Sequence, residues 1–483
     1  MKEEIRELTK ERVFYHFREI CNIPHGSGNE QAISDYLLRF AKDLHLDAKQ
    51  DASLNVFVKK PASPGYENAP AVCLQAHMDM VCEKAEGVVH DFTKDPIEWV
   101  IEGDFLSTGG KTTLGADNGI GVALIMALLE DDTLSHPPLE ALFTTMEEED
   151  LSGAEHFDTS EMNANILINL DHVRDDEILC GSCGGMQVDF HLPTAARPVP
   201  AGWQALTLRV AGLKGGHSGE DIHRGRGNAN ILLARALTAL EKESPILLHS
   251  IKGGSFRLAI PRDASAVLFA DKKDVEALTR CLSLFEETVR NELPDSGESL
   301  SVSLSSSEEA PSQGISPAPV LSVLTLIPDG IYQMSEVFEG VVDTSDNLGE
   351  VYLDENGLHL VLEIRSARES LRTYLFERME RLAVLLGGTC TFSNAYPSWD
   401  YRKDSPLRSL CGSVYQKLFQ TLPAFLVVHA GLEVGCFFET KKGLDAVSLG
   451  PNMRDFHSPS ETLEISSVRK EYTYLCAVLS AIR

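Results

Sequence analysis

The chain has 483 residues, of which 43% are hydrophobic and 24% charged, a composition typical of globular proteins. One hydrophobic core rarely extends past about 250–300 residues, so this length predicts at least two domains. The net charge of −29 argues against nucleic acid and anionic membranes as partners. The ten cysteines follow no repeating framework and the N-terminus lacks an apolar signal region, so we expect a reduced, cytoplasmic protein.

The first part of the chain alternates amphipathic segments with short apolar runs. Helical spacing of apolar residues predicts helices over Glu3–Asn22, Asn29–Leu46 and Ile120–Glu130. Strands are predicted over Asn55–Lys59, Ala71–His77, Leu139–Thr145 and Asn165–Leu170. This alternation predicts an α/β domain.

After Gly184-Gly185 the pattern changes to alternating apolar and polar residues. Strands are predicted over Trp203–Ala211, Phe256–Ile260, Ala264–Phe269, Leu300–Leu304 and Leu358–Ile364. Helices are predicted over Asn228–Glu243, Val275–Leu293 and Glu369–Leu386. An antiparallel sheet with helices on one face accounts for this pattern, so we expect an inserted α+β domain.

The first pattern returns near Tyr396. Here we predict a helix over Pro406–Gln420, a strand over Phe425–His429 and a final helix over Ile465–Ile482. The predicted organisation is therefore a first domain formed by 1–185 and 398–483, interrupted by a second domain over 186–397.

A histidine and an acid stand at the end of the strand that closes at His77. His77 and Asp79 are two residues apart, so on an extended backbone their side chains point the same way. A neutral imidazole can bind a divalent metal through one nitrogen while a carboxylate accepts the N–H of the other. A hydrogen-bonded core histidine is the alternative interpretation.

Further acids stand at comparable junctions. Asp117 lies in a glycine-flanked turn before a helix, where an N-cap is the alternative role. Glu147 and Glu148 follow a predicted strand, although an acidic run is often only a solvated surface. Asp171 follows the next strand. Functional residues gather beyond the carboxyl ends of strands in open α/β sheets, and converging carboxylates repel without cations, so the pattern predicts bound divalent metal.

Several motifs together resemble the co-catalytic di-zinc metallopeptidases. They are HMD at 77–79, GADNG at 115–119, MEEED at 146–150, NLD at 169–171, GGHSGEDIHRGRGNAN at 215–230 and FHSPSE at 456–461. The segments DFTKDPI at 91–97, TLGADNGIG at 113–121, AIPR at 259–262 and HAGLE at 429–433 narrow the resemblance to the aminoacyl-histidine dipeptidases. The resemblance extends from about residue 10 to the C-terminus.

This resemblance implies a two-zinc centre, with manganese or cobalt as alternatives. His77 and Asp171 would bind one ion, Glu148 and His457 the other, and Asp117 would bridge them. Asp79 would orient His77, and Glu147 would act as general base on the attacking water. Glu149 is the nearest competitor for either glutamate role.

The resemblance also implies residues that handle the substrate. His217 would stabilise the tetrahedral intermediate, across a dimer or by closure of a lid, with a locally packed loop histidine as the alternative. Arg262 and Arg365 are candidates for binding the substrate carboxylate, unless they are structural arginines. His429 and Glu433 would line the pocket without binding metal.

The implied fold is a zinc-peptidase-type α/β catalytic domain, with a mixed sheet flanked by helices, and an inserted α+β lid or dimerisation domain. The implied function is hydrolysis of Xaa-His and related dipeptides by a homodimer. A tripeptidase, aminoacylase or deacylase of the same superfamily is the closest rival. A non-catalytic binding protein could have lost Glu147 or a metal ligand, whereas this chain keeps them. No G-x-S-x-G segment supports a serine hydrolase.

Overall fold

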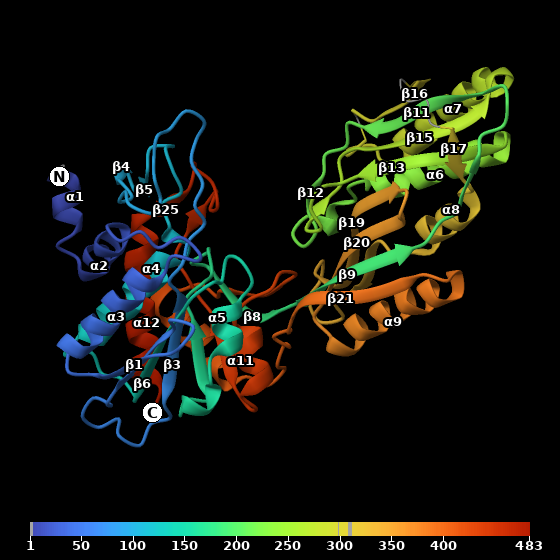
Figure 1. Cartoon of the computed structure of the whole chain (residues 1–483). Helices are drawn as coiled ribbons and strands as arrows, with labels where there is room; N and C mark the ends of the chain where they lie inside the picture. Colours follow the sequence, from blue (N-terminus) through green and yellow to red (C-terminus); the bar gives the residue numbers. More distant parts are fainter. Residues whose placement is uncertain (1–2, 298, 308–311) are drawn as a thin grey trace. The chain divides into compact units, whose positions relative to one another are not determined.

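The computed structural model describes residues 3–297, 299–307 and 312–483. The chain forms two compact units (Figure 1). Unit 1 contains the chain up to Ser182 together with Trp399–Val428 and Leu432–Arg483, and unit 2 contains Cys183–Ser398 and His429–Gly431. Both units combine sheets with helices, which confirms the predicted fold class.

Unit 1 is built on an eight-stranded mixed sheet. In spatial order its strands are β1 (Asp47–Gln50), β2 (Val56–Lys60), β6 (Leu139–Thr144), β3 (Val72–His77), β7 (Ile166–Asn169), β23 (Asp445–Ser448), β8 (Glu177–Ser182) and β22 (Ala424–Val428). Strand β3 is central and pairs in parallel with both β6 and β7. A small antiparallel sheet consists of β24 (Met453–Arg454), β25 (Thr462–Glu464), β5 (Phe105–Ser107) and β4 (Val100–Glu102).

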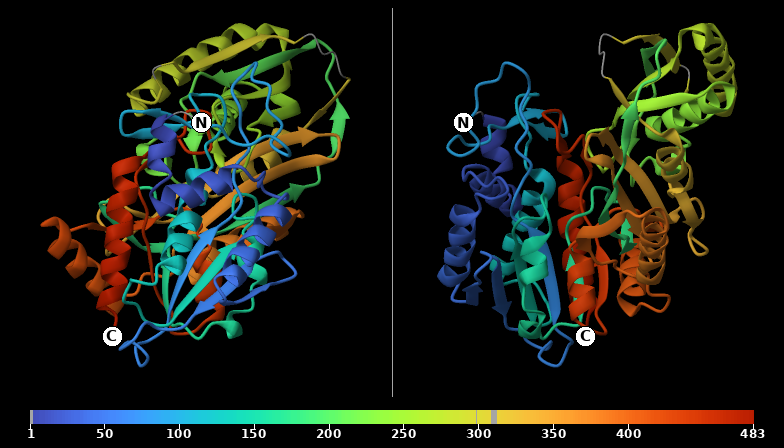
Figure 2. Two further views of the ribbon diagram at one scale, coloured as in Figure 1. Left: turned by 90° about the vertical axis from the view of Figure 1, so that its left-hand side faces the viewer. Right: turned by 45° about the vertical axis from the view of Figure 1, so that its right-hand side comes forward.

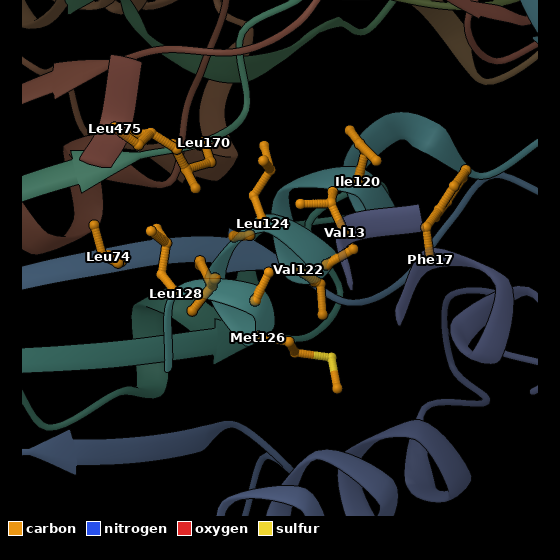
Figure 3. Packing of buried hydrophobic residues seen from close by; sticks show 14 of the residues in the cluster. Val13, Phe17, Leu74, Ile120, Val122, Leu124, Met126, Leu128, Leu170 and Leu475 are labelled. Atoms are coloured by element: carbon orange, nitrogen blue, oxygen red, sulfur yellow. The ribbon is translucent and has the colours of Figure 1, made fainter. Parts of the chain in front are cut away.

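The helices of unit 1 come from the N-terminal part of the chain, blue to teal in Figure 2, and from its C-terminal part, orange to red. They are α1 (Glu3–Leu8), α2 (Arg12–Cys21), α3 (Gln31–Asp43), α4 (Ala116–Glu130), α5 (Ser152–His156), α10 (Pro406–Phe419), α11 (Val434–Thr440) and α12 (Ile465–Ala481). Helix α4 is apolar all round and buried along almost its whole length. Figure 3 shows its side chains packed among residues of α2, β3 and α12, for example Phe17, Leu74 and Leu475. This packing on all sides anchors the α4 N-terminus, which carries Asp117.

Unit 2 contains an antiparallel sheet whose main path has the order β16 (Ser301–Ser306), β11 (Trp203–Ala211), β15 (Ala264–Asp271), β13 (Ile246–Gly253), β19 (Val342–Asp354), β20 (Gly357–Ser366), β9 (Gly184–Leu192) and β21 (Thr389–Tyr396). Strands β10 (Ala196–Pro198), β17 (Gln313–Ile315) and β18 (Gly330–Met334) pair beside this path, and β12 (Gly216–His217) pairs with β14 (Ala259–Ile260). Helices α6 (Ala229–Glu243), α7 (Val275–Glu292), α8 (Pro317–Leu326) and α9 (Glu369–Leu386) share one buried cluster with the sheet.

Two predicted elements differ from the structure. The helix predicted over Glu3–Asn22 is interrupted between Leu8 and Arg12. The strand predicted over Phe256–Ile260 is wrong except for its last two residues, because the preceding segment is a turn in which Phe256 is half exposed. No helix in the described part of the chain combines the length and apolar character needed to cross a membrane.

Candidate active site

The candidate site of unit 1 lies where the parallel strands β3, β6 and β7 end. His77 is the last residue of β3 and is aligned with Thr144, the last residue of β6. Glu147 and Glu148 follow β6, and Asp171 follows β7. Since neighbouring parallel strands end at the same edge of a sheet, these side chains converge there, as the sequence predicts.

Asp117 reaches the same place from the start of α4, where its own backbone angles, φ −84° and ψ 104°, are not yet helical. Gly115, with φ +70°, precedes this helix, and a Cβ atom there would meet Met80 Sδ at 2.8 Å, so glycine is required on both counts. The carboxylate of Glu461 accepts backbone N–H groups from Leu114 at 2.6 Å and Ala116 at 2.8 Å. Glu461 therefore secures the turn that carries Asp117. The sequence analysis gave Glu461 no role, although it ends the FHSPSE motif.

The two carboxylate oxygens of Asp117 face two different histidines. Asp117 Oδ1 lies 3.2 Å from His77 Nε2, and Asp117 Oδ2 lies 3.2 Å from His457 Nε2. Asp171 Oδ1 lies 3.3 Å from His77 Nε2, and Glu148 Oε2 lies 3.0 Å from His457 Nε2. Asp117 thus stands between a pair formed by His77 and Asp171 and a pair formed by His457 and Glu148.

Asp79 contacts both His77 and the acidic run that follows β6. Its Oδ1 lies 3.4 Å from His77 Nδ1, and the Asp79 carbonyl oxygen lies 3.1 Å from the same nitrogen. Its carboxylate also accepts the backbone N–H groups of Glu147 at 3.1 Å and Glu148 at 3.2 Å, and the Ser27 hydroxyl at 2.8 Å. Asp79 therefore links the orientation of His77 to the position of the acidic run.

The electrostatics of the site reflect an excess of buried carboxylates. Burial raises the pKa of Glu148 to about 7, with repulsion from Asp117 adding to it and the hydrogen bond to His457 opposing it. Burial also raises the pKa of Glu147 well above its ordinary value. Burial lowers the pKa of His457, but hydrogen bonds to Asp117 and Glu148 outweigh this and raise it to about 11. Positive charge is thus strongly favoured between these acids.

This donor set fits divalent metal ions. Three overlapping groups have their ligand atoms within 4.8 Å of one another: His77, Glu147 and Glu148; His77, Asp117 and Asp171; and Asp117, Glu148 and His457. In addition, Glu148 Oε1 is buried without a hydrogen-bond partner among the described residues. Such an oxygen is costly to bury unless a cation binds it. The last two groups share only Asp117, so the arrangement has room for two ions with this acid as the bridge.

Glu433 is a buried acid next to the ligands. It is fully buried, and its Oε2 accepts hydrogen bonds from Gln75 Nε2 at 2.5 Å and Thr144 Oγ1 at 2.8 Å. Burial raises its pKa to about 8. Gln75 and Thr144 lie within β3 and β6, so Glu433 is held against the sheet at the base of the site. None of the three metal-capable groups contains Glu433.

A second cluster of predicted residues lies in unit 2. The Nδ1 atom of His217 accepts backbone N–H groups from Gly219 at 3.3 Å and Glu220 at 3.2 Å. Its Nε2 lies 3.5 Å from Arg365 Nη2. Burial and the charge of Arg365 lower the pKa of His217 to about 4, so the ring is neutral with its proton on Nε2. His217 and Arg365 therefore present two hydrogen-bond donors side by side.

Arg365 is buried without an acid against its guanidinium. Its Nε donates to Ser218 Oγ at 3.3 Å and its Nη1 donates to Tyr396 Oη at 2.9 Å, while the side chain is 3% exposed. Within the described residues no carboxylate forms an ion pair with it. Glu363, which accepts a hydrogen bond from Tyr396 Oη at 3.3 Å, contributes negative charge near Arg365 without forming an ion pair with it. The guanidinium therefore remains able to bind an external carboxylate or oxyanion.

The remaining predicted residues are distributed differently. His429 belongs to unit 2, where its Nε2 lies 2.7 Å from Ser345 Oγ, and burial lowers its pKa to about 3. Arg262 is exposed and packs over Gly215.

The chain is similar to known proteins over nearly its whole length. Residues 208–297 match the model of a peptidase dimerisation domain. The cytosol non-specific dipeptidase of Escherichia coli (strain K12) is 38% identical over 481 residues, which cover 99% of each chain.

Solved structures agree with this similarity. The crystal structure of aminoacylhistidine dipeptidase from Vibrio alginolyticus is 36% identical, with a TM-score of 0.90, and covers 100% of this chain and 98% of that one. Aminopeptidase PepT from Bacillus cereus is 15% identical, with a TM-score of 0.57 over 98% of each chain, and shares the fold.

Proposed function

The chain belongs to the dipeptidase family of metallopeptidases that includes these relatives, and we propose that it hydrolyses Xaa-His and related dipeptides at a two-zinc centre. The resemblance inferred from the motifs is thereby confirmed. The observation that carries the proposed chemistry is the position of Asp117, whose two oxygens face His77 and His457. Imidazole and carboxylate ligands together suit zinc, with manganese or cobalt as substitutes.

In the proposed mechanism, Glu147 acts as the general base. Divalent ions held by His77, Asp171, Asp117, Glu148 and His457 would polarise the scissile carbonyl and lower the pKa of the attacking water. Glu147 takes a proton from that water and returns it to the leaving amine. The Glu147 carboxylate suits this role because it lies 3.9 Å from His77 Nε2 and its side chain is only 14% exposed. The backbone N–H of Glu147 donates to Asp79, which fixes the position of the residue.

His217 and Arg365 form the proposed substrate-binding part of unit 2. The Nε2–H of His217 donates to the oxyanion of the tetrahedral intermediate. Arg365 binds the substrate carboxylate, because its guanidinium is buried and lacks an acid partner among the described residues. Arg262, His429 and Glu433 remain predicted residues of the substrate pocket.

We further propose a cytoplasmic homodimer in which unit 2 acts as the lid. Two features support it: the match of residues 208–297 to a peptidase dimerisation domain, and the cytosolic relative. The experiment is hydrolysis of a panel containing β-alanyl-histidine, other dipeptides, a tripeptide and an N-acyl amino acid. We expect dipeptides to be hydrolysed, with activity lost on chelation and restored by zinc. Preference for the tripeptide or the N-acyl amino acid would contradict the proposed specificity.

A further inference from the structure

One face of the unit 2 sheet carries aligned cations instead of apolar residues. Arg209 on β11 is directly opposite Ser265 on β15, and Ser265 is directly opposite Lys252 on β13. Directly paired residues of antiparallel strands project from the same face of a sheet. Arg209, Ser265 and Lys252 therefore form a row across three neighbouring strands.

The opposite face of these strands is the packed one. The residues that flank Arg209 on β11, Leu208 and Val210, are buried in the cluster shared with α6 and α7. The row containing Arg209 thus faces away from these helices, and both of its cations are exposed.

A third cation completes a concave surface. A cavity of about 750 Å³ is lined by Arg209, Lys252 and Arg262 together with the hydroxyl groups of Thr207, Ser255 and Ser265. Asp263 is the one acid in this lining. None of the three cations forms an ion pair with a carboxylate in the described parts of the chain. The chain has 72 Asp and Glu residues and 43 Lys and Arg residues. A cavity lined mainly by cations is therefore opposite in charge to the chain as a whole.

We propose that this cavity binds a small multivalent oxyanion of the phosphate type. Cations without acid partners inside a concave surface focus their field on the enclosed space, and hydroxyl groups supply further hydrogen bonds to oxygen. A multivalent anion contacts several of these groups at once, whereas a single peptide carboxylate cannot satisfy three separated cations. The proposal does not rest on the proposed hydrolytic reaction, but its cavity shares Arg262 with the predicted substrate pocket.

The cavity also borders the segment that carries His217. Gly216 is part of its lining and pairs with Ile260, and a Cβ atom at Gly215 would lie 2.3 Å from Arg262 Cγ. An anion held by Arg262 therefore lies against the β12–β14 pair.

The test is equilibrium dialysis of radiolabelled inorganic phosphate against the metal-loaded, full-length protein at constant ionic strength. We compare the native chain with Arg209→Gln, Lys252→Gln and the double variant. Lys242→Gln is the matched control, because Lys242 is an exposed cation on α6, which packs on the other face of the sheet. The exchanged side chains are exposed, and unchanged circular dichroism establishes that each variant is folded.

We expect each single variant to weaken one phosphate-binding site about tenfold, the double variant to abolish it, and Lys242→Gln to leave it unchanged. Phosphate that binds at the metal centre would bind equally to all variants, so it does not affect the differences between them. Identical binding by the native chain and the double variant, including no binding by either, would overturn the proposal. Displacement of phosphate by equal concentrations of the monocarboxylate N-acetylglycine would also overturn it, since the site would then be one for single carboxylates.

Discussion

Each unit of the molecule contains a cluster of charged side chains that the described residues do not fully neutralise, and the two clusters have opposite charge. In unit 1 the carboxylates of Asp117, Glu148 and Asp171 surround two histidines, and Glu148 Oε1 has no hydrogen-bond partner among the described residues. In unit 2 the buried guanidinium of Arg365 lies beside the neutral ring of His217, again without an acid partner among those residues. We therefore expect the first cluster to bind cations and the second to bind an anion.

This difference indicates that the two clusters have different roles. Ligands of a metal need a rigid framework, and the first cluster is attached to the ends of central parallel strands and to the fully packed helix α4. The second cluster is attached to the short β12 segment and to β20, so it is built to receive a ligand rather than to hold an ion. Metal binding should therefore depend on the first cluster alone, whereas turnover should depend on both clusters.

The largest expected effect comes from the proposed base in the first cluster. Glu147→Gln should retain both metal ions yet reduce turnover by roughly 10²–10⁴, the range of general acid–base catalysis. Steady-state kinetics with metal analysis measures both quantities. Glu149→Gln is the control, because Glu149 is the exposed neighbour in the same run. If Glu148→Gln instead spares metal and stops turnover, the two glutamate roles are exchanged.

The second cluster should show a slightly smaller effect on turnover. His217→Ala should lower kcat by roughly 10²–10³, as for loss of one oxyanion donor, with metal content unchanged. His223→Ala, in the same loop and exposed, is the control. Loss of metal from the His217 variant would show that the two clusters are not separable.

Mixing variants shows which chain His217 serves. Inactive His217→Ala and Glu147→Gln proteins are combined under subunit exchange, and activity is followed. Partial recovery would show action across a dimer, because one site of each mixed dimer would hold an intact base and an intact donor. No recovery despite exchange would assign His217 to its own chain.

The smallest effect concerns the stability of unit 2. Asp346 is buried, and neither carboxylate oxygen has a hydrogen bond of standard geometry among the described residues. Burial and repulsion from Asp329 and Glu363 raise its pKa well above the ordinary value, while the backbone N–H of Asn347 and the charge of Arg378 oppose this shift. Burial likewise raises the pKa of Asp329 to about 6. Because the folded state holds these protons more tightly, the stabilisation is complete below about pH 4 and is lost as pH rises through the folded pKa values.

Asp346→Asn should therefore raise the unfolding midpoint of unit 2 at pH 8 and reduce its decrease between pH 5 and pH 8. The stabilisation at pH 8 should be about 1 kcal/mol, within the usual range for single substitutions. Calorimetry at several pH values measures it. Asp354→Asn, at the exposed end of the same strand, should change little. A native midpoint independent of pH would contradict the assignment of a buried, protonated carboxyl group.

Much of the candidate site could be predicted from the sequence, because the end of a buried strand can be recognised from the few residues around it. His77, Glu147, Glu148 and Asp171 follow short apolar runs, and the parallel pairing of β3 with its neighbours brings them together. The side chain of Asp117 is not used as an N-cap, because its two carboxylate oxygens face His77 and His457.

Other features depend on contacts that sequence patterns do not reveal. Glu461 accepts N–H groups more than 340 residues away, and Glu433 is fixed by Gln75 and Thr144 on separate strands. The assignment of His429 to unit 2 likewise follows from tertiary packing, since the segments on either side of His429–Gly431 belong to unit 1. Strand β13 escaped prediction because its register shifts between Leu248 and Ser250, which breaks the alternation of apolar and polar residues.

The central claim is a two-ion centre bridged by Asp117, and elemental analysis of metal-replete protein tests it most directly. We expect two divalent ions per native chain, loss of both in Asp117→Ala, and weakening of mainly one site in His77→Ala. Glu149→Ala should keep both ions. A native chain with at most one ion, or an Asp117→Ala variant that retains two, would contradict the bridged centre.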